Sequence, residues 1–337
     1  MRRLFQMHSR RDKEQIVVSD STRKRVLRWI EANRILRILP HLERRLRPLG
    51  LLHRRLSSTG KPYRLAQVDG SVLGKFPTVC LTLLGEVNLP LLIRPMGKKG
   101  KELPVAHALI RAAAKRLKEH SPELWVLDGL YFHASTFSFI CKELGSHLLL
   151  KCKDPEFRDV LKDASAYSPH PPSIGDPPHS VEGWDSERQC SWTLKTTSGE
   201  FAGVPVSISL LEEHYPKRAR QKTVSTWIVT TLLSLKGAEL REAAHLRWQI
   251  EHNLFKRLSH LCATKRFWFK HPTPFFNLLR LVAAAVASWD AFLTIVRQSP
   301  DLFKRMLRGA RFTWKIFFSQ LRYTLRLTTL QRLLALS

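Results

Sequence analysis

The sequence predicts an α/β fold in which a mixed β-sheet is flanked by helices. Two observations support this prediction: short apolar runs alternate with helical periodicity, and the first three runs are joined by short turns. Alternating strands and helices favour a sheet layered with helices, and short turns between successive strands make part of that sheet antiparallel. The expected strands cover residues 65–69, 79–84, 89–93, 124–128 and 148–152.

The segments between these runs fix the order of the expected elements. Gly85 to Asn88 are turn residues, so they connect the second strand to the third. Pro104 to His120 predicts a helix, because apolar side chains recur on one face of this segment. A short helix is expected from Phe137 to Leu144, between the fourth and fifth strands.

The first 60 residues are expected to form a basic helical module. They hold 16 lysines and arginines against 5 acidic residues, and their apolar residues recur at helical spacing. Pro40 and Pro48–Gly50 interrupt this pattern, and residues 57–62 have the composition of a linker. Such a module suggests DNA binding, and a solvated helical face is the alternative.

A β-rich insertion is expected at about residues 154–223. Prolines crowd a loop from Ser168 to Ser180, and residues 191–196 and 204–211 have the pattern of strands. The chain then returns to the core at residues 227–233.

The last segment is expected to be a basic helical tail. It holds nine lysines and arginines against one aspartate. The predicted division of the chain is therefore a module, a central domain with its insertion, and a tail, at residues 1–60, 61–296 and 297–337.

The charge of the chain points to a polyanionic partner. The sequence has 56 lysines and arginines against 28 acidic residues, which gives a net charge of +28. Basic side chains at phosphates release counterions, and this release gives sequence-independent affinity for nucleic acid. A solvated basic surface and an anionic membrane are the alternative interpretations of the charge.

Other features predict a cytoplasmic protein without a membrane span. The five cysteines are scattered and show no metal-binding spacing, which is typical of reduced thiols. Residues Met1 to Gln6 lack the apolar core of a signal sequence. The most apolar segment, residues 278–296, contains Arg280 and Asp290, so a buried helix is expected there.

Three acidic residues lie where a cluster of metal-binding carboxylates would need them. Asp69 and Asp128 each end an apolar strand-like run, and Glu251 lies in a helical run. Carboxylates at strand ends point into the crevice where α/β sheets bind ligands. Three carboxylates, two at strand ends and one on a helix, could hold two divalent metals for phosphodiester chemistry. The alternatives are turn positions for the two aspartates, which precede glycines, and an Arg247–Glu251 ion pair along the helix.

Four stretches of the sequence resemble the DDE transposases of bacterial insertion sequences, in the group with a Tyr-Arg-Glu-Lys signature. They correspond to the first catalytic Asp, the segment after the strand hairpin, the second Asp and the helix with the Glu: Val68–Ser71, Arg94–Leu103, Val126–Tyr131 and Leu246–Lys256. The similarity spans roughly residues 63–290. Ala244 and Leu258 stand where the signature has Tyr and Lys, which puts in doubt how such a chain would bind the transposon end.

The resemblance implies an RNase H-like fold with a β-rich insertion before the helix that carries the Glu. It implies that Asp69, Asp128 and Glu251 are catalytic and bind two Mg²⁺ ions, or Mn²⁺. The implied reaction is cleavage of DNA at the ends of the element, followed by strand transfer into a target.

The resemblance also implies the partners of the chain. These are double-stranded DNA, as terminal inverted repeats and as target, and a second copy of the chain in a synaptic complex. Arg247, Lys256 and Arg257 are the expected DNA-binding residues near the site. A Trp of the insertion can stack on a flipped base in this family, so Trp184 and Trp192 are candidates for stacking, although core packing is the expected role of both.

Two other functions fit the same residues. A decayed or domesticated transposase would keep the basic surface and bind DNA without cleaving it, and the loss of the signature Tyr and Lys favours this alternative. A metal-dependent nuclease of the same fold would cleave DNA without strand transfer.

Overall fold

The computed structural model describes most of the chain between residues 32 and 298. Residues 1–291 form one compact unit, which contains the sheet, and residues 292–337 form a second. Two short strands near the N-terminus, β1 (Gln6–Met7) and β2 (Ile16–Val17), pair antiparallel. The described residues are 6–7, 16–17, 32–73, 75–97, 102–153, 157–158, 179–216, 222–249, 255–256, 258 and 271–298.

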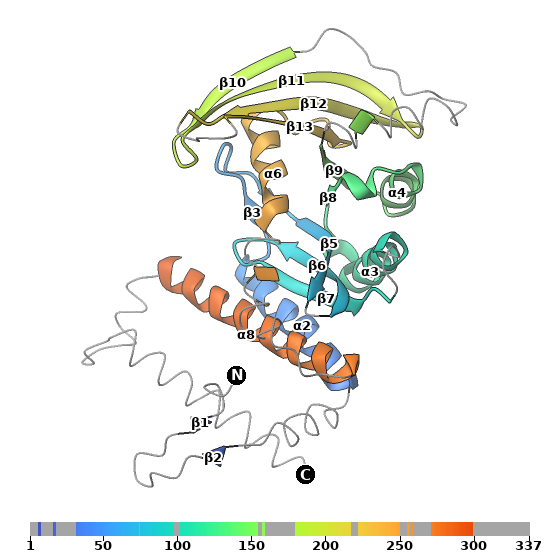
Figure 1. The fold of residues 1–337 in the computed structure, drawn as a ribbon, viewed down its shortest axis with the longest axis vertical. Coiled ribbons are helices and arrows are strands. Elements are labelled where there is room, and N and C mark those ends of the chain that lie inside the picture. The colour runs from blue at the N-terminus through green and yellow to red at the C-terminus, as the bar shows by residue number, and fades with distance from the viewer. Residues whose placement is uncertain are drawn as a thin grey trace, which may run out of the picture. The chain divides into compact units, whose positions relative to one another are not determined.

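A nine-stranded mixed sheet forms the centre of the first unit (Figure 1). The strand order is β10-β11-β12-β13-β9-β8-β5-β6-β7. The pairs β5–β8 and β8–β9 are parallel, and the other neighbours are antiparallel. The predicted α/β class, with a mixed sheet flanked by helices, is confirmed. The strands between the module and the insertion are β5 (Leu65–Leu73), β6 (Phe76–Leu84), β7 (Leu89–Pro95), β8 (Leu124–Asp128) and β9 (His147–Cys152).

The first of these strands is longer than the sequence predicts. β5 continues beyond Asp69 to Leu73, where it pairs with Phe76 across a tight connection to β6. Asp69 therefore lies inside a strand, and its interpretation as a strand-end residue is wrong. The reason is the hairpin: β6 supplies backbone partners for Gly70 to Leu73, which have no alternating apolar pattern of their own. Asp128, by contrast, is the last residue of β8, as predicted.

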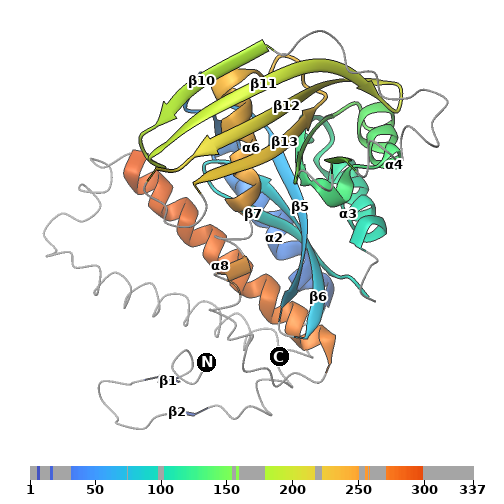
Figure 2. The ribbon, with the colours of Figure 1, turned by 45° about the horizontal axis from the view of Figure 1, so that its top comes forward.

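Helices cover both faces of the sheet. α3 (Glu102–Leu117) and α4 (Ala134–Phe137), which continues into a π-helical turn (Ser138–Glu143), lie on one side, and α6 (Gly237–Gln249) lies on the other (Figure 2). α3 buries the apolar face that its sequence pattern predicts, with five residues at helical spacing: Ala106, Leu109, Ile110, Ala113 and Leu117.

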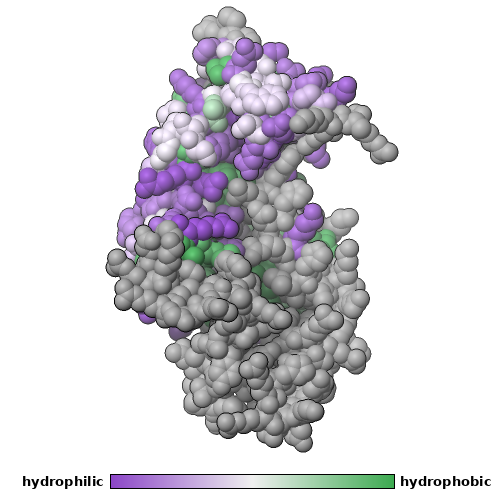
Figure 3. All heavy atoms as spheres, turned by 90° about the vertical axis from the view of Figure 1, so that its left-hand side faces the viewer, coloured by the Kyte–Doolittle hydropathy of each residue, from purple (hydrophilic) through white to green (hydrophobic). Residues whose placement is uncertain are grey.

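The insertion extends the sheet. β10 (His179–Asp185), β11 (Cys190–Phe201), β12 (Val204–His214) and β13 (Thr223–Thr230) form an antiparallel series, and β13 joins the series to β9. The sequence predicts β11 and β12 but not β10, whose apolar residues are few. On the face shown in Figure 3, the upper part, where these strands lie in Figure 1, is mainly hydrophilic.

The described part of the N-terminal module packs against the sheet. α2 (Ala32–Leu46) lies against β7 and runs through Pro40, so the expected break at this proline is wrong. Pro40 has no backbone N–H, so the carbonyl of Leu36 lacks its helical hydrogen bond. Leu36 is 45% exposed, so water can reach this residue. A 3₁₀ turn (Arg47–Leu49) follows.

Residues 57–60, predicted to be part of a linker, form the turn of a small hairpin. Its strands are β3 (Arg54–Arg55) and β4 (Pro62–Tyr63). Ser57 and Ser58 donate hydrogen bonds through their backbone nitrogens to Glu242 of α6, at 2.9 and 3.2 Å. This turn is therefore bound to α6, and the domain boundary at residue 60 stays a prediction.

α8 (Pro272–Gln298) is the longest helix of the described chain. Phe275 stacks on Phe76 of β6, with ring centroids 4.9 Å apart, and Arg280 donates a 2.9 Å hydrogen bond to the carbonyl of Ile93. By length and composition α8 could cross a membrane. A single helix of this length and composition is weak evidence of a membrane span, because the core helices of soluble proteins have the same length and composition. The contacts of Phe275 and Arg280 with β6 and β7 agree with the core helix that the sequence predicts.

We expect Gly85→Ala to destabilise the junction between the hairpin β6–β7 and the N-terminal module. A Cβ at Gly85 would lie 2.5 Å from the backbone oxygen of Leu51 and 2.7 Å from the backbone of Leu52. Overpacking of this kind costs about 1–3 kcal/mol, which urea unfolding would measure. Glu86→Gln changes the same turn, keeps a side-chain acceptor for the backbone nitrogen of Arg55 and should cost less than about 0.5 kcal/mol. Equal effects of the two substitutions would contradict the close packing at Gly85.

Candidate active site

Asp69 is a buried carboxylate on the central strand β5. Its side chain is 6% exposed. Side chains alternate across a strand, so Asp69 lies on the same face as Gln67. Gln67 Nε2 donates a 2.8 Å hydrogen bond to the carbonyl of Arg247 in α6. Asp69 therefore faces the side of the sheet that α6 covers.

Asp128 lies on the neighbouring strand at the same level. The parallel register pairs Gln67 with Val126, and Asp69 and Asp128 each follow two residues later. Both carboxylates are thus on adjacent strands, on the same face of the sheet. Asp128 Oδ1 accepts a 3.0 Å hydrogen bond from the backbone nitrogen of Leu130, which caps the 3₁₀ turn Gly129–Tyr131. Its other oxygen is 3.9 Å from Nη1 of Arg247.

A buried lysine continues this row on the third strand. Lys151 of β9 pairs in register with Asp128, and it is 7% exposed. Burial lowers the pKa of Lys151 to about 8; Glu213 opposes this shift, and Arg247 adds to it. The row Asp69–Asp128–Lys151 therefore crosses three adjacent strands, and the carboxylate that favours the charged form of Lys151 is Glu213. The sequence does not predict this position for Lys151, because the residue lies in an apolar run.

A fourth acidic residue, Glu102, lies near the site from the other face of the sheet. Its Oε1 accepts a 2.9 Å hydrogen bond from the hydroxyl of Tyr131. Burial, and then the negative charges of Glu102, Asp128 and Asp69, raise the pKa of Tyr131 well above its ordinary value. A Cβ at Gly70 would collide with the Glu102 carboxylate, so glycine next to Asp69 leaves room for this contact.

Asp69 also acts on the thiol beside it. Cys80 pairs with Asp69 in the β5–β6 register and is fully buried. Burial raises the pKa of Cys80 to about 12; a hydrogen bond from Thr82 opposes the shift, and the charge of Asp69 adds to it. Cys80 is therefore a neutral thiol at physiological pH.

A buried ionic cluster attaches α6 to the insertion. Glu213 of β12 is 2% exposed. Its Oε1 accepts hydrogen bonds from Arg241 Nε at 3.0 Å, Arg241 Nη2 at 2.6 Å and His245 Nε2 at 2.9 Å. Arg241 Nη1 also donates to Asp185 Oδ2 at 2.8 Å. Two strands of the insertion, β10 and β12, thereby hold two consecutive turns of α6.

The charges in this cluster are fixed by burial and by the hydrogen bonds. Burial alone would raise the pKa of Glu213, but the hydrogen bonds from His245 and Arg241 lower it to about 2. Burial lowers the pKa of His245 to about 4, against the effect of Glu213. At pH 7 the cluster therefore contains a carboxylate, a guanidinium and a neutral imidazole that donates from Nε2.

The predicted site residues between residues 244 and 258 differ in how the structure places them. Glu251 and Arg257 lie outside the described residues, so their positions in the site stay predictions. Arg247 lies near Asp128, and Lys256 is exposed. Ala244 and Leu258, which replace the Tyr and Lys of the transposase signature, are both buried in the core.

The two tryptophans of the insertion differ in exposure. Trp192 is 7% exposed and lies under the guanidinium of Arg241, 5.5 Å from the ring centroid. Core packing is therefore its observed role. Trp184 is 56% exposed, so the expectation of core packing is wrong for this residue, which stands on the edge strand β10.

The described residues offer part of a metal-binding donor set. Asp69 and Asp128 are hard oxygen donors of the kind that Mg²⁺ takes in proteins. Within the described ranges, however, there is no group of three or more His, Cys, Asp or Glu side chains that could hold a metal ion. A complete site would need Glu251 or another ligand in addition to the two aspartates.

Comparison of the chain with models of known protein families and with curated proteins finds no match.

We expect His245 to make the protein sensitive to mild acid. Its pKa is about 4 in the folded protein and about 6.5 in an unfolded chain. Between these values the unfolded chain binds a proton that the folded chain does not, so the free energy of unfolding decreases as the pH falls. This decrease is at most about 3 kcal/mol.

Urea unfolding at pH 7, 6, 5 and 4 would measure this effect. His245→Gln keeps a donor for Glu213 but does not titrate, so its unfolding free energy should change less than that of the wild type. His179→Gln, at an exposed position, should behave as the wild type does. The same pH dependence in His245→Gln as in the wild type would contradict the buried neutral imidazole.

Proposed function

We propose that the chain catalyses metal-dependent phosphoryl transfer on DNA, as a transposase of the DDE type. The observation that supports this most is the position of Asp69 and Asp128. They lie on adjacent parallel strands, on one face, two residues beyond the last paired residues. The site would thus contain two carboxylates from strands and, in the proposal, Glu251 from the helix that follows them.

The order of the five strands β7-β6-β5-β8-β9 agrees with the proposed RNase H-like fold. β7 pairs antiparallel with β6 and β6 with β5, and β8 and β9 continue the sheet parallel to β5. α6 lies on the face with the aspartates, and Glu251 follows Arg247 by four residues in the sequence. One turn of a continuing helix would bring Glu251 to the same side of α6 as Arg247.

Each residue has a proposed role. Asp69, Asp128 and Glu251 would bind two Mg²⁺ ions, or Mn²⁺, which would lower the pKa of a bound water and stabilise the developing charge on the phosphodiester. Arg247 would hold Asp128 in position or contact a DNA phosphate. Lys151, which is in register with Asp128 on the neighbouring strand, would add positive charge near that carboxylate when no metal is bound. Lys256 and Arg257 would contact DNA, and Trp184 has the exposure that base stacking requires.

The proposed partners follow from the same chemistry. They are double-stranded DNA with terminal inverted repeats, a target DNA, and a second copy of the chain during synapsis. A net charge of +28 supports a polyanionic partner. The proposed location is the cytoplasm, in association with the nucleoid.

A non-catalytic DNA-binding protein of the same fold is the second candidate. Two observations favour it: Ala244 and Leu258 are fully buried, so neither position can present a DNA-binding side chain. This candidate predicts DNA binding without any metal-dependent cleavage by the wild-type chain.

We expect Asp69→Asn, Asp128→Asn and Glu251→Gln each to abolish DNA cleavage and to leave DNA binding largely intact. Each change removes the charge of a metal ligand without adding bulk. The substrate would be supercoiled plasmid containing the DNA that flanks the coding sequence, with Mg²⁺ or Mn²⁺, and gel electrophoresis would detect nicked and linear products. Glu143→Gln, which alters a side chain that is 58% exposed, should cleave as the wild type does.

The result separates the candidates. Cleavage by the wild type that is lost in all three variants supports the proposal. Unchanged cleavage in any one variant removes that residue from the site. Tight DNA binding without cleavage by the wild type, in either metal, favours the non-catalytic candidate.

A further inference from the structure

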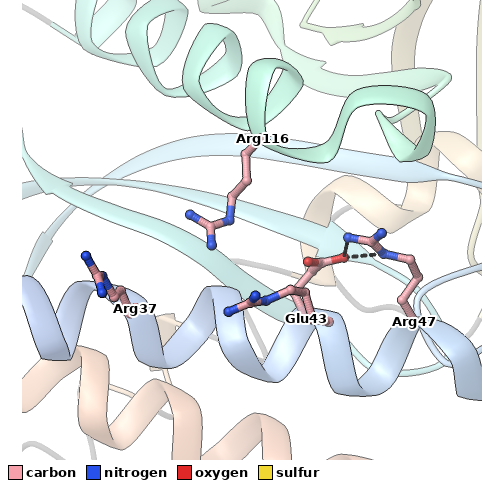
Figure 4. Close-up of a pocket in the computed structure, with 5 residues that line it drawn as sticks. Arg37, Glu43, Arg47 and Arg116 are labelled. Carbon is pink, nitrogen blue, oxygen red and sulfur yellow. Dashed lines mark hydrogen bonds and ion pairs between the residues drawn. The ribbon is translucent and has the colours of Figure 1, made fainter.

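A cavity lined by arginines lies between α2 and α3. Its volume is about 400 Å³, and its lining residues are Arg37, Glu43, Arg44, Arg47 and Arg116. Figure 4 shows Arg116 extending from α3 toward α2, which carries Arg37 and Glu43; Arg47 is the first residue of the 3₁₀ turn that follows α2. The cavity thus combines side chains from the N-terminal module and from α3, the first helix after strands β5, β6 and β7.

The single carboxylate that lines the cavity is already engaged. Glu43 is 2% exposed and accepts a 2.7 Å hydrogen bond from Arg47 Nε. Across the part of the chain that the structure describes, no carboxylate forms an ion pair with Arg37, Arg44 or Arg116. Three guanidinium groups therefore remain available to an anion in one cavity. Glu119 does not line the cavity, and its side chain is 73% exposed.

The arginines lie close enough to act on one another. Burial and the nearby charge of Arg44 lower the pKa of Arg116, against a smaller opposite effect of Glu43. Arg37 and Arg44 are seven residues apart, which on a helix places them on the same face about 10 Å apart. The positive charges therefore repel one another, and an anion bound between them would reduce this electrostatic repulsion.

We propose that this cavity binds phosphate groups, and that these are phosphates of a DNA backbone. Arginine is suited to phosphate because its planar guanidinium donates two parallel hydrogen bonds to it. Two available guanidinium groups along one helix, those of Arg37 and Arg44, lie opposite a third from Arg116, and this arrangement matches an extended polyanion better than a single small ion.

The cavity is separate from the carboxylates. Arg116 and Glu102 are 14 residues apart on α3, which corresponds to about 21 Å along the helix. DNA held at the cavity would therefore contact the protein away from the proposed site, since α3 lies on the face of the sheet opposite α6 and the two aspartates. Binding at the cavity does not require cleavage, so it is expected whether or not the chain cleaves DNA.

The test compares two double variants of the full chain. Arg44→Ala/Arg116→Ala removes two charges from the cavity. The matched control, Arg45→Ala/Lys115→Ala, removes two exposed charges one position away on the same two helices. Fluorescence anisotropy with a short labelled duplex would give the affinity between about 50 and 200 mM salt. In a second arm, inorganic phosphate would be titrated into each protein and its effect on the thermal unfolding midpoint measured.

The two arms distinguish the sources of the phosphate. Each lost phosphate contact reduces the slope of log affinity against log salt by about 0.9. We therefore expect the cavity variant to lose roughly 1.8 from this slope and the control to lose less. A saturable rise of the unfolding midpoint with phosphate, lost only in the cavity variant and without a change of DNA slope, would assign the cavity to free phosphate instead. Equal slopes and equal phosphate responses in the two variants would overturn the proposal.

Discussion

The buried ion pair between Arg241 and Glu213 determines where α6 lies, and the candidate site depends on α6. Glu213 accepts three hydrogen bonds from two residues of the helix, and its own strand belongs to the insertion. Removing one partner of a buried pair leaves an uncompensated charge and costs about 3–5 kcal/mol. The insertion therefore has a structural role, because it holds the helix whose Arg247 lies at Asp128 and, in the proposal, whose continuation presents Glu251.

A second constraint comes from placing two aspartates side by side. Asp69 is almost fully buried, and burial disfavours an ionised carboxylate unless opposite charges are near. Arg247 of α6 supplies such a charge to the neighbouring Asp128, at 3.9 Å, and Lys151 of β9 is in register with Asp128. The hydroxyl of Tyr131 and the carboxylate of Glu102 complete the surroundings from the other face. Divalent metal would relieve the same repulsion, so the arrangement is consistent with a site that is stable both with and without metal.

The sequence predicts the central strands and helices well, because their apolar runs and turn residues are local signals. Gly85 to Asn88 ends β6 and starts β7 as expected. The extension of β5 beyond Asp69 could not be predicted, because Gly70 to Leu73 show no alternating apolar pattern and depend on β6 for pairing. Pro40 is a strong local signal for a break, yet tertiary packing keeps it inside α2. The sequence does not predict the roles of Glu102, Lys151 and Glu213, because their partners are distant in sequence and only the fold brings them together.

Hydrogen exchange of α6 in Glu213→Gln tests most directly whether this ion pair positions the helix. Glu212→Gln is the matched control, since Glu212 is the preceding residue, is 36% exposed and pairs with Lys195. We predict that amides of residues 237–249 exchange roughly 100-fold faster in Glu213→Gln, as a loss of about 3 kcal/mol implies. Amides of β5, β6 and β7 should keep their protection, and Glu212→Gln should match the wild type. Unchanged protection of α6 in Glu213→Gln would contradict this role of the ion pair.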